Sequence, residues 1–179
     1  MQGQDILHFW FDELTHTQHF AKDAALDEMI RTRFGDTLEA APRCELFAWR
    51  ATPEGALAEI IVLDQFSRNI YRDFPQSFAQ DGTALALAQL LVASGQDRQL
   101  GTPQRRFAYM PYMHSESALI HAQAMQLFDL PGIEQAMDFE QRHQSIIARF
   151  GRYPHRNAVL GRTSTAEEIA FLNEPGSSF

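Results

Sequence analysis

Apolar residues recur along most of the chain with the three-to-four-residue spacing of amphipathic helices. After Asp23, one helical face is expected to collect five apolar residues, Leu26, Met29, Ile30, Phe34 and Leu38. Asp23 is placed to cap the start of that helix, which we expect to run to about Ala40. Strand-like alternation does not extend beyond four residues anywhere in the sequence. The pattern therefore predicts an all-α protein.

Capping residues and helix breakers divide the chain into roughly seven to nine helices joined by short links. The predicted helix starts are Thr52 with Pro53, Asp81, Thr102 with Pro103, and Ser164 in a capping-box spacing with Glu167. The predicted ends or interruptions are Pro75, Gly95, Pro111 and Gly151. Because short links favour antiparallel neighbours, we expect a globular bundle or a stack of antiparallel helical hairpins.

Length and composition agree with this reading. A chain of 179 residues that is 45% hydrophobic is typical of one globular domain, here residues 1–179. No window approaches ~18 consecutive apolar residues, so no membrane span is predicted. The first residues lack the basic region and cleavage site of a signal peptide, and Cys44 has no second cysteine to pair with. These features favour a cytoplasmic protein.

Charge is distributed unevenly along the chain. The net charge of −8 disfavours nucleic-acid binding, which needs a basic surface. The cations are 14 arginines and the single Lys22, and arginine is the residue that pairs bidentately with carboxylate or phosphate. Four of these arginines and no acid lie within residues 149–162. This basic segment in an acidic protein is the first candidate for chemistry.

Two further polar segments lie near predicted helix ends. In residues 63–75, Asp64, Arg68 and Arg72 are spaced by four, so they share one helical face with Asn69 beside them. In residues 109–118, His114 and Glu116 lie at the mouth of a predicted helix, where the backbone attracts anions. Each segment also has a plain structural interpretation, as an ion-pair ladder in the first case and a helix cap in the second.

The basic segment combines a helix end with a rigid turn. Gly151 is placed to end the preceding helix, so Arg149 and Arg152 can stabilise its negative end. Pro154 prevents helix and presents three polar side chains on irregular backbone, His155, Arg156 and Asn157. Arg162 follows after a second glycine. Loops that carry such side chains are common places for ligand contacts.

Sequence motifs for metals and cofactors are absent. The chain contains no HExxH, CxxC, GxxxxGK[ST] or GxSxG pattern. His114 and His121 are two helical turns apart, about 10 Å along an axis, so they cannot share one metal ion. We therefore expect neither a metal site nor a cofactor.

Three stretches together resemble a known bacterial family. They read LDQFSRNIYRDFPQSFAQD, FAYMPYMHSES and FGRYPHRNAVLGRTSTAEEIAFL, and they are similar to the family called domain of unknown function 924. The resemblance implies an all-helical, tetratricopeptide-repeat-like stack of antiparallel helices, and it implies no activity. The polar and turn residues that carry it are Asp64, Gln65, Arg68, Asn69, Arg72, Asp81, His114, Ser115, Glu116, Gly151, Arg152, Pro154, His155, Arg156, Asn157, Gly161 and Arg162.

Three functional hypotheses follow from these residues. In the first, the protein binds an anionic small molecule or an acidic peptide through Asp64, Arg68, Asn69, Arg72, Arg152, Arg156, Asn157 and Arg162. In the second, it is a hydrolase-type enzyme in which His114 or His155 is the general acid or base and Glu116 or Asp64 orients it. In the third, the arginines only neutralise the acids Asp64, Asp73, Asp81 and Glu116 within a protein-interaction scaffold. The oligomeric state is left open.

The hypotheses differ in what the structure should contain. A pocket lined by unpaired arginines favours binding, and a histidine–carboxylate pair facing a cleft favours catalysis. Arginines that are all paired internally favour the structural network. We also predict that the three segments meet in space, because the ends of antiparallel helices cluster.

Overall fold

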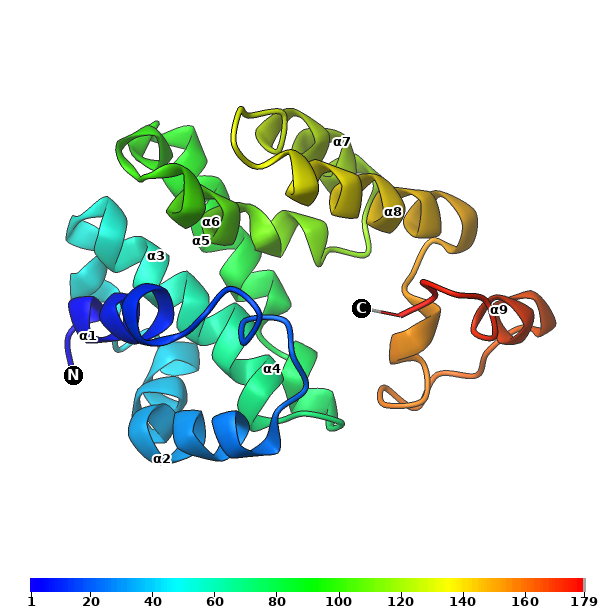
Figure 1. The fold of residues 1–179 in the computed structure, drawn as a ribbon, viewed down its shortest axis with the longest axis horizontal. Coiled ribbons are helices and arrows are strands. Elements are labelled where there is room, and N and C mark those ends of the chain that lie inside the picture. The colour runs from blue at the N-terminus through cyan, green and yellow to red at the C-terminus, as the bar shows by residue number, and fades with distance from the viewer. Residues whose placement is uncertain (179) are drawn as a thin grey trace.

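The computed structural model describes residues 1–178, and within that range the protein is all-helical, as predicted (Figure 1). Its helices are α1 (Gly3–His8), α2 (Ala24–Ala40), α3 (Pro53–Ile61), α4 (Ser67–Ile70), α5 (Asp81–Ala93), α6 (Thr102–Met113), α7 (Ala118–Leu127), α8 (Glu134–Phe150) and α9 (Ala166–Phe171). Short 3₁₀ and π-helical segments join several of them.

Local capping signals explain several helix ends. The Asp23 carboxylate accepts the backbone N–H groups of Ala25 and Leu26, and the Thr52 hydroxyl accepts that of Gly55. Gly151 ends α8 with φ 70°, a left-handed conformation that glycine adopts without strain. These boundaries confirm the predictions made from single capping residues.

Other predicted boundaries were wrong. The last capping box is Thr165 with Glu168, one residue later than the predicted Ser164 with Glu167. Pro111 does not interrupt α6, because the helix continues through it to Met113. Asp81 does not cap α5 but is its first residue, and its carboxylate is held by distant arginines.

The predicted long helix from Pro53 towards Pro75 is divided. It consists of α3, one π-helical segment over Val62–Phe66, and α4, which ends at Ile70. A π-helical turn widens the backbone by one residue and is often found at functional sites. Asp64 lies inside this segment and is 1% exposed.

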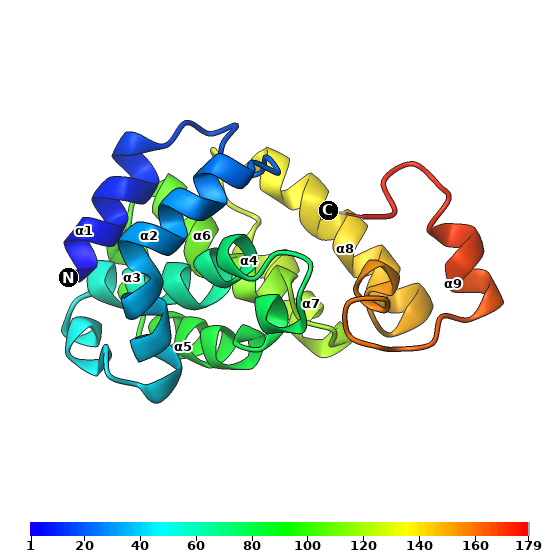
Figure 2. The ribbon, with the colours of Figure 1, turned by 90° about the horizontal axis from the view of Figure 1, so that it is seen from below.

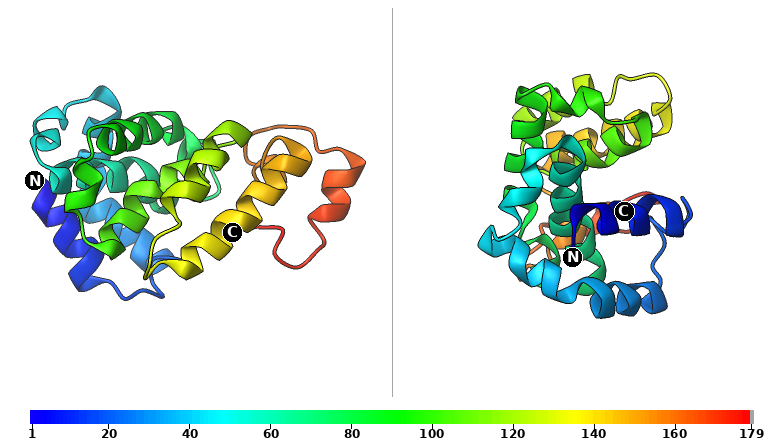
Figure 3. Two further views of the ribbon diagram at one scale, coloured as in Figure 1. Left: turned by 90° about the horizontal axis from the view of Figure 1, so that it is seen from above. Right: turned by 90° about the vertical axis from the view of Figure 1, so that its left-hand side faces the viewer.

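The helices pack in chain order around α3. That helix contacts α1, α5 and α6, and the series continues from α5 to α6, α7 and α8 (Figures 2 and 3). The main core runs through all of these helices and contains the aromatic rings of Trp10, Phe34 and Phe66. The likeness to tetratricopeptide repeats stays a prediction.

A smaller core holds the C-terminal segment. Ile146 and Ile147 of α8 pack with Tyr153 and Phe171, and α9 lies at the end of the molecule far from the N-terminus (Figure 1). The predicted basic segment is the chain between α8 and α9. It therefore follows directly after a helix that packs on α6 and α7, and this brings it towards the second polar segment.

Candidate functional site

The structure brings residues of all three predicted polar segments together. His114 lies on Asp64, with 2.7 Å between Nδ1 and Oδ1, and Arg68 reaches the same oxygen at 3.0 Å. Arg68 also contacts Asp81 at 3.0 Å, and Arg156 contacts Asp81 at 3.1 Å. The two carboxylates therefore link the three segments into one cluster, as the sequence predicted.

Asp64 is the most buried member of the cluster. Burial acts to raise the pKa of its carboxyl, but the charge of Arg68 and the hydrogen bonds from His114 and Gln65 outweigh burial and hold that pKa below its ordinary value. The Gln65 amide donates a further hydrogen bond to Oδ2 at 2.5 Å. Asp64 is therefore a buried carboxylate that keeps its negative charge.

His114 is kept neutral at ordinary pH. Burial and the neighbouring Arg68 lower its pKa, and Asp64 opposes them only in part. Since Asp64 accepts a hydrogen bond from Nδ1, the proton of the neutral ring lies on that nitrogen. Within residues 1–178, Nε2 has no hydrogen-bond partner, and His114 lines a pocket.

Arg156 is buried against two aromatic rings. Its guanidinium carbon lies 4.6 Å from the centre of the Phe78 ring and 4.5 Å from that of Tyr153, and its side chain is 7% exposed. Nη1 donates to Asp81, but neither Nε nor Nη2 has an acceptor among the described residues. A buried arginine with unused donors is uncommon, because each lost hydrogen bond is costly.

The start of α5 completes the site. Gln80 provides no side-chain cap, so the N–H groups of Gly82 and Thr83 have no partner among residues 1–178. Nothing lies within 4 Å of the place that a Cβ on Gly82 would occupy. Asp81 and Gly82 border the same pocket as His114, Glu116 and Arg156, a cavity of about 320 Å³.

Several predicted binding residues lie elsewhere. Asn69 and Arg72 both bind Asp27 of α2, with Arg72 bidentate at 2.6 and 2.8 Å. They join α4 to α2 and do not line the pocket. Asp73, predicted to lie in the buried network, pairs instead with Lys22 on the surface at 3.0 Å.

The rest of the basic segment is paired internally. Arg152 binds Glu168 bidentately at 2.6 and 2.8 Å, and Arg162 binds Glu116 at 2.6 and 2.9 Å. Asn157 bonds Arg162 and Ser164. These contacts match the structural hypothesis for this part of the segment. In the structure, Arg152 and Arg162 therefore bind carboxylates of the protein itself, and their part in holding a ligand stays a prediction.

His155, the second catalytic candidate, is half-buried and does not border the pocket. Burial and the charge of Arg156 lower the pKa of its ring to about 4. Its ring lies 5.5 Å from that of Tyr153. The position favours a packing role and leaves His114 as the histidine at the pocket.

Sequence reasoning missed a buried group beneath the pocket. His121 and Glu140 are fully buried, with 2.6 Å between Nδ1 and Oε1. Nε2 of His121 donates to the Ser115 carbonyl at 2.9 Å, and burial raises the pKa of Glu140. The pair holds the turn after His114 in place. In the sequence, the only sign of this pair was a histidine on a predicted helix. Glu140, the partner of His121, is 19 residues further along the chain.

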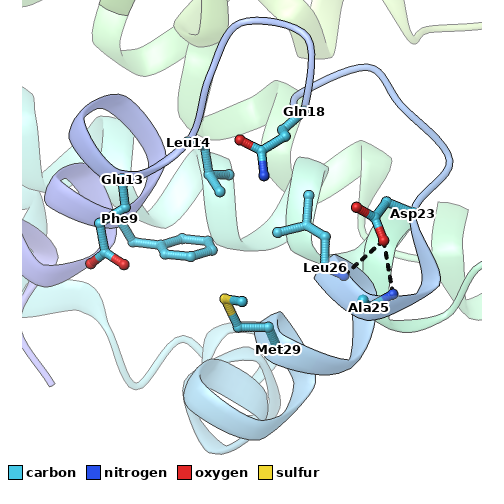
Figure 4. Close-up of a pocket in the computed structure, with 8 residues that line it drawn as sticks. All are labelled: Phe9, Glu13, Leu14, Gln18, Asp23, Ala25, Leu26 and Met29. Carbon is cyan, nitrogen blue, oxygen red and sulfur yellow. Dashed lines mark hydrogen bonds between the residues drawn. The ribbon is translucent and has the colours of Figure 1, made fainter.

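A second pocket of about 240 Å³ lies under the loop before α2 (Figure 4). Phe9, Leu26 and Met29 form its apolar side. Its two carboxylates have other partners, because Glu13 binds Arg33 and Asp23 caps α2. The arrangement offers a ligand little polar contact.

From residue 1 to residue 178, none of the helices combines the length and apolarity needed to span a bilayer. Over the same residues, no group of three or more histidine, cysteine, aspartate or glutamate side chains is arranged to hold a metal ion.

Comparison with known proteins gives a family and a fold. A family model described as a bacterial protein of unknown function (DUF924) matches residues 6–176. A solved structure of a protein of unknown function from Agrobacterium tumefaciens is 35% identical, with a TM-score of 0.90 and 96% of each chain covered. No curated protein matches the chain.

Proposed function

Because the chain belongs to the bacterial family DUF924, whose function is unknown, we propose a function from its pocket: it binds a small molecule through one anionic group held by Arg156. The pocket of about 320 Å³ has the size of a small-molecule site. A small cavity favours such a ligand over the acidic peptide that the sequence left open, which would need an extended groove.

The observation that carries this proposal is the unused hydrogen-bonding capacity of Arg156. A guanidinium has five N–H donors, and among the described residues this one makes a single hydrogen bond, to Asp81. The rings of Phe78 and Tyr153 hold the group in a fixed place. An anionic ligand would supply the acceptor that the protein does not, and a fixed guanidinium loses little entropy on binding it.

The start of α5 supports the same conclusion. Uncapped N–H groups at a helix N-terminus attract anions, and Gly82 leaves the backbone open to close approach. Arg156 and Gly82 belong to elements far apart in the sequence, yet both border one pocket.

The charges around the pocket favour a monoanion. Three carboxylates, Asp64, Asp81 and Glu116, face three guanidinium groups, Arg68, Arg156 and Arg162. These charges cancel, so the free donors and the helix N-terminus can balance about one added negative charge. A phosphate diester or a carboxylate carries that charge.

Titration with dimethyl phosphate tests the proposal. We expect calorimetry to detect binding that weakens as salt is raised, and to detect none for the uncharged trimethyl phosphate. Arg156→Gln should weaken binding at least about tenfold, because a charged hydrogen bond is lost. Arg149→Gln is the matched control, because Arg149 is exposed and pairs with Glu167. Absence of binding to the wild type, or equal affinity in Arg156→Gln, would refute the proposal.

A further inference from the structure

The geometry of the cluster points to catalysis at the same pocket. We infer that His114 is a general base that activates water for hydrolysis of a phosphate diester, and that Asp64 positions it. This inference rests on the proposed function, because the diester must first be held by Arg156. The reaction at this binding site would be hydrolysis, and the substrate class would be phosphate diesters.

The hydrogen bond of His114 and its place at the pocket suit this role. A general base needs a lone pair directed at the substrate and a partner that fixes the ring. Here Asp64 accepts the Nδ1 proton at 2.7 Å, so the lone pair of the neutral ring is on Nε2. Nε2 has no partner among residues 1–178, and the residue borders the cavity.

Asp64 is suited to hold the ring in that tautomer. It is 1% exposed and remains charged beside Arg68, so it also stabilises the imidazolium formed when His114 takes a proton. Its oxygens are fixed by Arg68 and Gln65. A carboxylate held by two further side chains cannot turn away from the histidine.

Hydrogen bonds from buried side chains hold the turn after His114 in place. His114 ends α6, and its N–H bonds the Met110 carbonyl at 3.0 Å. The Ser115 carbonyl accepts from buried His121, and Tyr153 donates to the Met113 carbonyl at 2.5 Å. Catalytic groups need such support, because a small displacement of the base costs much of the rate.

The reaction can be written with all atoms accounted for. Nε2 of His114 takes a proton from water, and the water oxygen forms a bond to phosphorus. The bond from phosphorus to one ester oxygen breaks, and that oxygen takes the proton from the imidazolium. The products are a phosphate monoester and an alcohol, and His114 returns to its neutral form.

Charge development favours a diester over a monoester. A diester brings one negative charge, which the balanced cluster accepts, whereas a monoester dianion would bring two. In the transition state the phosphoryl oxygens gain charge, and Arg156 and the N–H groups at the start of α5 are placed to stabilise it. The donors that bind the ligand would therefore also lower the barrier.

Hydrolysis of methyl p-nitrophenyl phosphate tests the inference. The assay follows release of p-nitrophenolate in the presence of a chelator, which suppresses contaminating metal-dependent enzymes. We expect His114→Gln to lower turnover at least about 100-fold, the usual contribution of a general base. His8→Gln is the control, because His8 is exposed and pairs with Asp12. Both variants should keep the wild-type affinity for dimethyl phosphate.

A second measurement does not depend on a variant that folds. Nitrogen-15 NMR of the wild-type histidines should show His114 protonated at Nδ1 and unprotonated at Nε2 at neutral pH. A proton on Nε2 in the wild type would overturn the inference. So would wild-type turnover no higher than that of His114→Gln. If dimethyl phosphate still binds in either case, the binding proposal survives and the catalytic inference alone fails.

Discussion

Two arginines four residues apart in the basic segment differ in what surrounds them. Arg152 uses Nε and Nη2 on Glu168, and Nη2 also reaches the Thr163 carbonyl. Arg156 has one hydrogen bond, to Asp81, although it is the more buried of the two. Both lie in one short basic segment, and the difference comes from the partners that the tertiary structure brings to each.

The comparison separates structural from functional charge. Arg152 joins the segment before α9 to α9 itself, where a carboxylate satisfies it. Arg156 lines a pocket, and among the described residues its guanidinium has one hydrogen-bond acceptor, Asp81. A paired arginine stabilises the fold, whereas an arginine with free donors beside a cavity is prepared for a ligand.

The largest expected effect is on the stability of the protein, when Arg68 is removed from the buried cluster. Arg68→Ala removes the cation between Asp64 and Asp81 and leaves the buried Asp64 carboxylate with only His114 and Gln65. We predict a loss of about 3–5 kcal/mol in the free energy of unfolding. Urea denaturation of the wild type and the variant measures it. A loss below about 1 kcal/mol would mean that Arg68 is no more than an exposed ion pair.

A buried histidine of α8, His143, should make stability depend on pH. His143 packs 5.6 Å from the Tyr153 ring, and burial lowers its pKa to about 3. Other histidines, His114, His121 and His155, act in the same direction. Below the ordinary histidine pKa of about 6.5 the unfolded chain binds a proton that folded His143 does not. Stability should therefore fall as pH decreases from 6.5 towards 3.

The size of this effect can be measured with one variant. One histidine changes the free energy of unfolding by up to about 1.4 kcal/mol per pH unit, or roughly 2 kcal/mol between pH 6.5 and pH 5. Urea denaturation at several pH values should give a shallower dependence for His143→Phe. Equal slopes in the two proteins would show that His143 is not held neutral by burial.

A smaller effect on stability, without an effect on binding, should distinguish Arg152 from Arg156. Arg152→Gln leaves Glu168 without its bidentate partner, although Thr165 still donates its N–H to that carboxylate. We predict a melting temperature several degrees lower and an unchanged affinity of the folded protein for dimethyl phosphate. Differential scanning calorimetry and titration below the transition measure the two quantities. Weakened binding in this variant would place Arg152 in the site.

The smallest effect concerns an exposed arginine of the same segment. Arg149 pairs with Glu167 at 2.9 Å, with both side chains largely in solvent. Arg149→Gln should cost less than about 1 kcal/mol, measured by urea denaturation, and high salt should remove the difference. A larger cost would mean that charge in this segment matters through the segment's overall field rather than through individual partners.

The sequence predicted those features that depend on neighbouring residues. Asp23, Thr52 and Gly151 act on the backbone within four residues, so capping rules located α2, α3 and the end of α8 correctly. The helical period of apolar residues gave the fold class. The four-residue spacing of Asp64 and Arg68 predicted their ion pair, observed at 3.0 Å.

Features that depend on distant partners could not be predicted. Asp81 has the sequence features of a cap, but Arg68 and Arg156, which are 13 and 75 residues away, bind its carboxylate. Nothing in the sequence around Asp27 predicted that its carboxylate would bind Asn69 and Arg72, which therefore lie away from the pocket. Charge pattern identified the arginines, and only the tertiary structure shows which of them have free donors.

One titration tests the central claim most directly: dimethyl phosphate with Arg156→Gln and Arg152→Gln side by side. Melting curves first establish that both variants are folded at the titration temperature. We predict wild-type affinity in Arg152→Gln and at least about tenfold weaker binding in Arg156→Gln. Equal affinity in the two variants would contradict it, because the free donors of Arg156 would then have no part in holding an anion.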